Sequence, residues 1–267
     1  MSKNKFWQQL RYSGALFLTA IAMTIFGAQY YQSLAENNNI NIDWAYEGEA
    51  NAHRWGLLAP EFESCRLGDQ QSPVNIKNVD HYNKTAPIKF NYQPGTVDVV
   101  NNGHTIQVNY PPGSTILLNN EEYELLQFHF HTPSEHMIDN KTSAMEAHFV
   151  HKNKAGKLAV VGVLIDSGTD NPLIASIWEA TPNSNKANNV SKIRLNAANL
   201  LPDNKNFYSY EGSLTTPPCS EGVSWNVFSE PVEVSPEQIT FFEQIFSNNA
   251  RPTQPLNDRP VEYRRGN

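Results

Sequence analysis

The 267-residue sequence contains few cysteines, few charged residues and no excess of positive charge. Its only two cysteines, Cys65 and Cys219, exclude a small disulfide scaffold and any zinc site built from four thiolates. Charged residues make up 18%, against an average of about 25%, and the net charge of −7 provides no basic surface for nucleic acid. Because 39% of the residues are hydrophobic, a disordered chain is excluded.

Long apolar runs are also scarce, and this excludes a polytopic membrane protein. One apolar run, residues 14–28, is shorter than the ~20 residues of a spanning helix and follows a basic segment, residues 1–11. Small residues at Ser33 and Ala35 are typical of a signal-peptidase site. We therefore predict a signal peptide over residues 1–35, with an uncleaved membrane anchor as the alternative, then a short polar linker over residues 36–41. The protein is expected to be exported, to the periplasm or out of the cell.

Export changes the interpretation of the two cysteines. In an oxidising compartment an even pair with no third partner is a disulfide candidate, and two buried free thiols are the alternative. A bond that closes so long a loop would stabilise the fold by about 5 kcal/mol through loop-closure entropy.

Beyond the N-terminal segment, long stretches with a helical period are missing. Short alternating or apolar runs predict strands instead, at residues 89–92, 96–101, 105–110, 123–131, 143–153, 158–166 and 224–227. Two short helices are expected, at residues 172–179 and after Ser235, which is a good N-cap before proline. We predict a mostly β, single domain over residues 42–267. It is built on a large central, mainly antiparallel twisted β-sheet with a few short peripheral helices.

Six of the eight histidines lie between His104 and His151, and the densest group is on a predicted strand. His129 and His131 are two residues apart, so both side chains point to the same face of the strand. Gln127 shares this face, where its amide oxygen can accept the spare N–H of a metal-bound histidine.

A second strand carries Glu146 and His148 on one face. An antiparallel neighbour of this kind would bring His148 to the first pair, and three histidines leave Zn²⁺ one open position, as in catalytic zinc sites. Glu146 would then orient a ligand imidazole. The spacing His129-x-His131-x3-Glu135 also fits the metal motif of cupins, in which the Glu is a ligand. That alternative lacks its usual glycines and its later His–Asn pair.

A third segment, Ser-Leu-Thr-Thr-Pro-Pro at residues 213–218, decides between the zinc site and the cupin motif. Together with the motifs above, it makes the sequence similar to the α-class carbonic anhydrases, specifically their bacterial exported branch, over essentially the whole mature chain. The motifs that carry the resemblance are Gln-Ser-Pro-Val-Asn-Ile at 71–76, Asn-Asn-Gly-His at 101–104, residues 127–131, Ser-Glu-His at 134–136, Glu146-x-His148, Ser-Leu-Thr-Thr-Pro-Pro at 213–218, Trp225 and Asn249-x-Arg251-Pro252.

The resemblance implies a carbonate dehydratase in which zinc-bound hydroxide attacks CO2 to give bicarbonate and a proton. One Zn²⁺ per chain would be held by His129, His131 and His148. Thr215 would accept a hydrogen bond from the hydroxide and donate its own proton to Glu135.

The resemblance also implies the surroundings of the zinc. His104 matches the proton shuttle, and Asn249 joins Gln127 and Glu146 behind the ligands. The residues that match the CO2 pocket are Val150, Val160, Leu214, Thr216 and Trp225. Those that match the solvent network are Tyr46, Asn102 and Gln107, where Gln107 replaces the commoner Asn. Of the remaining histidines, His136 is expected on the surface or in a loop, and His151 is expected to close a hydrogen bond near the end of its strand.

The expected partners are CO2 and bicarbonate, with inhibition by sulfonamides and small anions. Nucleic acid and membrane partners are not expected, apart from the signal segment, and the protein is predicted to be a monomer or homodimer. A catalytically inactive, carbonic-anhydrase-like binding domain is the main alternative. Such domains typically lose one zinc ligand, whereas this chain retains all three. A cupin-type metal oxygenase is the weaker alternative.

Overall fold

A computed structural model describes residues 43–77, 79, 82–83, 87–182 and 190–266. The expected signal peptide and polar linker lie outside these residues. Within the described part of the chain, no helix has the length and apolar character needed to cross a membrane. The described residues from Trp44 onward pack as one unit.

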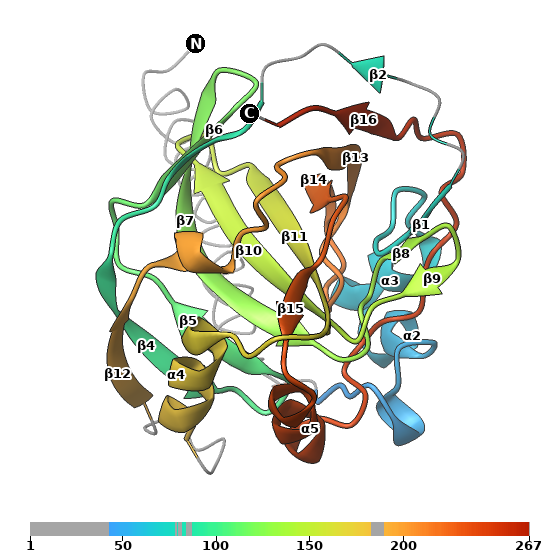
Figure 1. The fold of residues 1–267 in the computed structure, drawn as a ribbon. Coiled ribbons are helices and arrows are strands. Elements are labelled where there is room, and N and C mark those ends of the chain that lie inside the picture. Colours follow the sequence, from blue (N-terminus) through green and yellow to red (C-terminus); the bar gives the residue numbers. More distant parts are fainter. Residues whose placement is uncertain (1–42, 78, 80–81, 84–86, 183–189, 267) are drawn as a thin grey trace, which may run out of the picture. The chain divides into compact units, whose positions relative to one another are not determined.

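A sheet of 13 strands organises this unit (Figure 1). Its main path runs, in spatial order, through β12 (Val190–Leu195), β4 (Gly95–Asn101), β5 (Ile106–Asn109), β7 (Glu121–His131), β10 (Met145–Asn153), β11 (Leu158–Ser167), β14 (Glu221–Phe228), β13 (Phe207–Ser213), β16 (Glu262–Arg264) and β2 (Tyr82–Asn83). Beside this path lie β15 (Val232–Val234), β6 (Thr115–Leu118) and β3 (Lys89–Asn91). A separate small sheet contains β1 (Asn75–Ile76), β8 (Met137–Ile138) and β9 (Lys141–Thr142).

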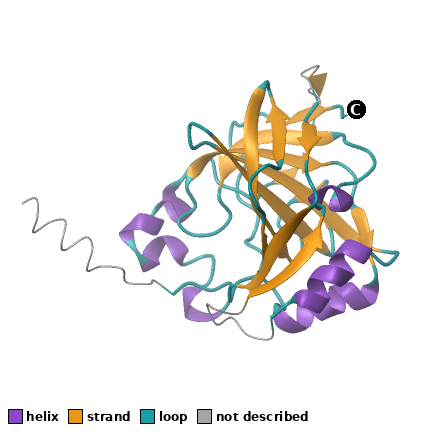
Figure 2. Ribbon diagram, turned by 90° about the vertical axis from the view of Figure 1, so that its left-hand side faces the viewer, coloured by secondary structure: helices purple, strands orange, loops and turns teal. Residues whose placement is uncertain are grey.

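Most neighbouring strands of the large sheet are antiparallel, and β11 is parallel to both β14 and β15. The helices are short and lie around the strands, as Figure 2 shows. Their bounds are α2 Trp55–Leu58, α3 Ser64–Leu67, α4 Pro172–Ala180 and α5 Pro236–Ile245, with 3-10 turns η1 Gly48–Ala50, η2 Pro60–Phe62 and η3 Ala197–Leu200. The predicted fold class is therefore confirmed.

The two longer helices begin where the sequence predicts them. Ser235 and Gln238 form a reciprocal capping box at the start of α5, which satisfies backbone N–H groups that the helix itself cannot pair. At α4 the side chain of Asn171 accepts from the N–H groups of Leu173 and Ile174.

Strands β7 and β10 separate a hydrophobic core from a polar face. Phe128, Phe130 and Phe149 are completely buried in the largest hydrophobic cluster, with the rings of Phe128 and Phe149 stacked at 4.9 Å. Each buried phenylalanine contributes roughly 1.5–3 kcal/mol to folding. Because side chains alternate along a strand, this packing sends the intervening histidines to the opposite face.

His151 lies near the end of β10 and is fully buried. Its Nε2 is 2.7 Å from the hydroxyl of Tyr92, and its Nδ1 is 3.2 Å from the carbonyl of Ala159. This confirms the predicted hydrogen bond near the end of the strand. Burial lowers the pKa of His151 to about 4.

A disulfide joins Cys65 in α3 to Cys219, 154 residues further along the chain. The two cysteines pack with Trp55 in a small hydrophobic cluster of their own. The predicted pairing is therefore present, and it connects the N-terminal helices to the loop that follows β13.

Reduction of this disulfide should lower the melting temperature, because the unfolded chain regains the entropy of a long loop. The expected loss is about 2–5 kcal/mol of unfolding free energy. Thermal unfolding with and without reductant measures it. The Cys65→Ser, Cys219→Ser double variant should melt at the lower temperature in both conditions, and equal melting of oxidised and reduced wild type would contradict the prediction.

Candidate metal centre

Three imidazoles converge where β7 and β10 pair. His129 and His131 are on β7, and the antiparallel register places His148 directly opposite His129. Ring centroids lie 5.0 Å apart for His129 and His131, 5.4 Å for His129 and His148, and 4.5 Å for His131 and His148. One nitrogen of each ring lies within 4.8 Å of the others. The structure thus brings together the three residues that the sequence analysis named.

The two β7 imidazoles are each held at one nitrogen by an oxygen acceptor. His129 Nδ1 lies 2.8 Å from Oε1 of Gln127, and His131 Nδ1 lies 2.7 Å from the backbone carbonyl of Asn249. An oxygen acceptor requires the proton on Nδ1, so Nε2 carries the lone pair. The Nε2 atom of His131 is buried and has no hydrogen-bond partner.

The third imidazole faces a buried carboxylate. Nε2 of His148 lies 3.0 Å from Oε1 of Glu146, in ion-pair range but outside hydrogen-bond geometry. The other oxygen of Glu146 accepts from the backbone N–H groups of Glu135 and His136. Burial raises the pKa of Glu146, but His136 and His148 outweigh it, and the net pKa is well below its usual range. Glu146 is therefore ionised.

His136, Glu146 and His148 form a second group close enough to hold a metal. However, His136 donates or accepts at both nitrogens, with Glu146 at 2.8 Å and the hydroxyl of Tyr210 at 2.7 Å. Since the protein itself occupies these atoms, the group with His129 is the better metal site.

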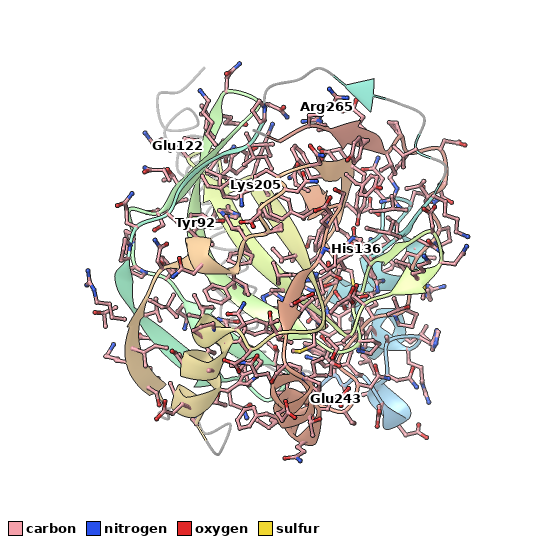
Figure 3. The ribbon with its side chains drawn as sticks, in the orientation of Figure 1. Tyr92, Glu122, His136, Lys205, Glu243 and Arg265 are labelled. Carbon is pink, nitrogen blue, oxygen red and sulfur yellow. A yellow bond between two sulfur atoms is a disulfide. The ribbon has the colours of Figure 1, made fainter. Side chains whose placement is uncertain are left out.

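The position of His136 corrects part of the sequence prediction. It lies in a loop, as expected, but it is 0% exposed, and Figure 3 labels it among the side chains. Its partners Glu146 and Tyr210 are on β10 and β13, which no local pattern around residue 136 indicates. The hydroxyl of Tyr210 continues the chain of hydrogen bonds to Ser72 at 2.9 Å.

The imidazoles have the protonation state that a metal requires. Burial lowers the pKa of His131 to about 4, and burial likewise lowers the pKa of His129 and of His148. Neutral imidazoles at pH 7 offer lone pairs without releasing protons. Three such nitrogens fit Zn²⁺ with an open fourth position. The unpaired buried Nε2 of His131 supports this fit.

Glu135 lies behind the histidines and is 2% exposed. Its Oε1 accepts from the backbone N–H of Arg251 at 2.7 Å, and its Oε2 is 3.8 Å from Nδ1 of His148. Burial raises the pKa of Glu135 to about 7, while His148 and the hydroxyl of Thr215 act in the opposite direction. The hydrogen bond from Thr215 to Glu135 stays a prediction.

Apolar side chains line one flank of the centre. Val160 and Trp225 are buried in one hydrophobic cluster, and Val150 and Leu214 pack against it. The ring of Trp225 lies 4.8 Å from that of His148. These four predicted pocket residues therefore belong together.

Thr216, the fifth predicted pocket residue, is partly exposed in the loop after β13. Its carbonyl accepts from the N–H of Cys219 at 2.9 Å, so the disulfide holds this loop.

His104 lies in the loop between β4 and β5. The side-chain oxygen of Asn102 accepts from the backbone N–H groups of His104 and Thr105, both at 2.9 Å. The amide nitrogen of Asn102 donates to Gln107 at 3.3 Å, so these two predicted network residues are connected.

Trp44, which the sequence analysis missed, stacks on His104. The two rings are 3.8 Å apart at an angle of 6°. Trp44 also meets the third network residue, Tyr46, edge-on at 5.5 Å. Burial raises the pKa of Tyr46, with a smaller contribution from Glu135. No sequence signal links Trp44 to a histidine 60 residues away.

Gly162 on β11 makes room for the carboxylate of Glu146. It pairs with His148 across β10 and β11. A Cβ at position 162 would lie 2.9 Å from Oε1 of Glu146 and 3.3 Å from Cγ2 of Val227. Only glycine therefore allows Glu146 to reach its two histidines from this position.

Gly162→Ala should weaken zinc binding by about 10–100-fold, because it displaces the carboxylate behind His148. The zinc dissociation constant, measured by competition with a chelator, tests this. Adding Val227→Ala relieves the contact with valine but not that with Glu146, so the double variant should still bind zinc weakly. Wild-type affinity in the single variant would contradict the prediction.

Comparison with known proteins agrees with this geometry. Residues 50–265 match the family described as eukaryotic-type carbonic anhydrase. A carbonic anhydrase of Nostoc sp. is 42% identical over 250 residues, which cover 91% of this chain and 95% of that protein. One from Pectobacterium carotovorum is 44% identical over 227 residues, covering 83% and 91%. The structure of the Thermovibrio ammonificans enzyme with the inhibitor sulfanilamide superposes with a TM-score of 0.78, at 41% identity, covering 83% and 99%. On these matches and this histidine cluster, the chain belongs to the α-carbonic anhydrase family of zinc enzymes.

Proposed function

We propose that His129, His131 and His148 hold the zinc ion with which this enzyme interconverts CO2 and bicarbonate. The supporting observation is that three neutral imidazoles converge, of which His131 and His148 are buried and His129 is partly exposed. Two of them have the second nitrogen bonded to an oxygen acceptor, and the third lies beside Glu146. In carbonic anhydrases, Zn²⁺ with one open position supplies a nucleophile by lowering the pKa of bound water to about 7. The other residues orient this nucleophile, hold the substrate and remove a proton.

Thr215 and Glu135 orient the nucleophile. With a cation held by the three histidines, Glu135 would be favoured in its ionised form, and its carboxylate would accept a hydrogen bond from the hydroxyl of Thr215. The oxygen of Thr215 is left as an acceptor that admits only a species with a proton to donate. This directs a lone pair towards the substrate, which is catalysis by positioning.

The apolar flank of Val150, Val160, Leu214 and Trp225 suits CO2, which has no net charge and accepts only weak hydrogen bonds. Burial of Val160 and Trp225 gives this wall a stable shape beside the histidines. Bicarbonate is charged and hydrated, so the same wall favours its release.

His104 carries the remaining proton to buffer. Among the side chains, imidazole is the one suited to gaining and losing a proton near neutral pH. Asn102 holds the backbone of this loop and donates to the side chain of Gln107.

The family membership supports binding of inhibitors, and the disulfide supports export. The related Thermovibrio enzyme binds sulfanilamide, and we expect sulfonamides to bind this metal site as well. The disulfide requires an oxidising compartment, which supports export and a signal peptide over residues 1–35.

His148→Ala should abolish stoichiometric zinc binding and lower CO2 hydration by at least about 100-fold, because two histidines on one strand do not complete a tetrahedral site. Metal analysis and a stopped-flow CO2 assay measure the two effects. His151→Ala, on the same strand, is the matched control and should lose stability but keep zinc. Normal zinc content in His148→Ala would end the ligand assignment. Zinc-loaded wild type without CO2 hydration would instead indicate an inactive binding domain.

His104→Ala should lower kcat in weak buffer by at least about tenfold, within the range of general acid–base catalysis. Because the shuttle acts after CO2 has reacted, kcat/KM should stay near the wild-type value. Added imidazole should restore much of kcat. A loss that is equal at every buffer concentration would contradict the shuttle role.

A further inference from the structure

Asn249 contacts both the metal centre and the loop that carries His104, with different atoms. Its backbone carbonyl accepts from Nδ1 of His131 at 2.7 Å. Its side-chain nitrogen donates to the carbonyl of His104 at 3.0 Å and to that of Phe130 at 2.9 Å. Its side-chain oxygen accepts from the N–H of Thr132 at 2.7 Å. The residue is 1% exposed, and both donors of its amide are occupied.

The side chain of Asn249 connects His104 to a strand outside its own loop. Asn102 binds the backbone N–H of His104 from within the same loop, and Trp44 stacks on the ring. Asn249 ties the backbone of His104 to Phe130 on β7, between the ligands His129 and His131. The hydroxyl of the neighbouring Thr105 bonds the same residue, donating to the carbonyl of Phe130 and accepting from its N–H.

We propose that the side chain of Asn249 is a positioning residue for proton transfer, which keeps His104 at a constant distance from the metal centre. The proposal rests on the proposed function, because it needs His104 as the shuttle. It goes further because it assigns different roles to the backbone carbonyl and the side chain of Asn249. The backbone carbonyl orients His131 and survives any substitution. The side-chain amide connects the carbonyl of His104 to the backbone of Phe130 and Thr132 on either side of His131.

A role in proton transfer and a purely structural role predict different effects of replacing Asn249. Proton transfer is sensitive to the distance and angle between donor and acceptor, so a loosened loop slows it. A purely structural role would instead weaken zinc binding and lower kcat and kcat/KM together.

Asn249→Asp in the full-length, zinc-loaded chain tests the proposal. The carboxylate keeps the acceptor for Thr132 but places oxygen against the carbonyls of His104 and Phe130. We expect kcat in weak buffer to fall between about tenfold and about 100-fold, as for other small misplacements. We expect kcat/KM for CO2 and zinc stoichiometry to match wild type, and imidazole to restore kcat.

A second readout does not depend on activity. Hydrogen–deuterium exchange of residues 101–106 should accelerate at least about tenfold in the variant, with or without zinc, because the loop loses its hydrogen bond to Asn249 and keeps only those of Asn102 and Thr105. Asn249→Ser, which adds no charge and is too short to reach both carbonyls, should give the same pattern if the Asp variant folds poorly.

Asn153→Asp is the matched control, since this buried asparagine donates to Glu121, accepts from the N–H of Lys157 and lies at the end of β10, beyond His148. It should lose stability without any change in kcat. Parallel loss of kcat, kcat/KM and zinc in Asn249→Asp, or wild-type kcat and exchange, would overturn the proposal. Buffer-independent turnover in wild type would instead remove the shuttle itself and with it the proposed function of His104.

Discussion

The register between β7 and β10 is the constraint on which the metal centre depends. It places His148 opposite His129 and Phe149 opposite Phe128, so one pairing assembles the histidine face and the aromatic core together. Because side chains alternate along a strand, a slip by one residue would exchange the two faces. Such a slip would bury imidazoles in the core and expose phenylalanine. The hydrophobic packing of Phe128 and Phe149 therefore protects the geometry of the metal centre as well as the stability of the fold.

Around this pairing, buried polar groups connect the site to distant parts of the chain. The side chain of Arg251 donates to Ser72 at 2.6 Å and to the carbonyl of Cys65 at 2.9 Å, while its backbone N–H holds Glu135. The same residue thus contacts one half of the disulfide and the carboxylate of Glu135 behind the histidines. Burial lowers the pKa of Arg251 to about 10, which leaves it charged at neutral pH. Breaking these hydrogen bonds would leave a buried charge without partners, at a large cost in free energy. They therefore fix the segments that contain Cys65, Ser72 and Glu135 relative to one another.

Local sequence patterns predicted those parts of the site that depend on a single strand. Gln127 and His129 face the same way because they are two residues apart, and the strand alternation of β7 is clear. Strand β13 was not predicted, because Glu211 and Gly212 interrupt its pattern and its order comes from pairing with β14 and β16. The burial of His136 likewise depends on partners far away in sequence, which no local pattern around it contains.

Buried polar atoms without partners make metal binding favourable for the stability of this site. Nε2 of His131 and Oε2 of Glu135 are buried without hydrogen-bond partners, and each costs about 1–3 kcal/mol while it stays so. An ion that binds the folded chain offsets part of this cost, and by mass action it stabilises the fold by about 2.7 kcal/mol at a hundredfold excess over its dissociation constant. The arrangement that makes the imidazoles available for catalysis therefore weakens the zinc-free fold. Stability and activity therefore depend on the same ligand, whereas the disulfide and the aromatic core stabilise the fold without it.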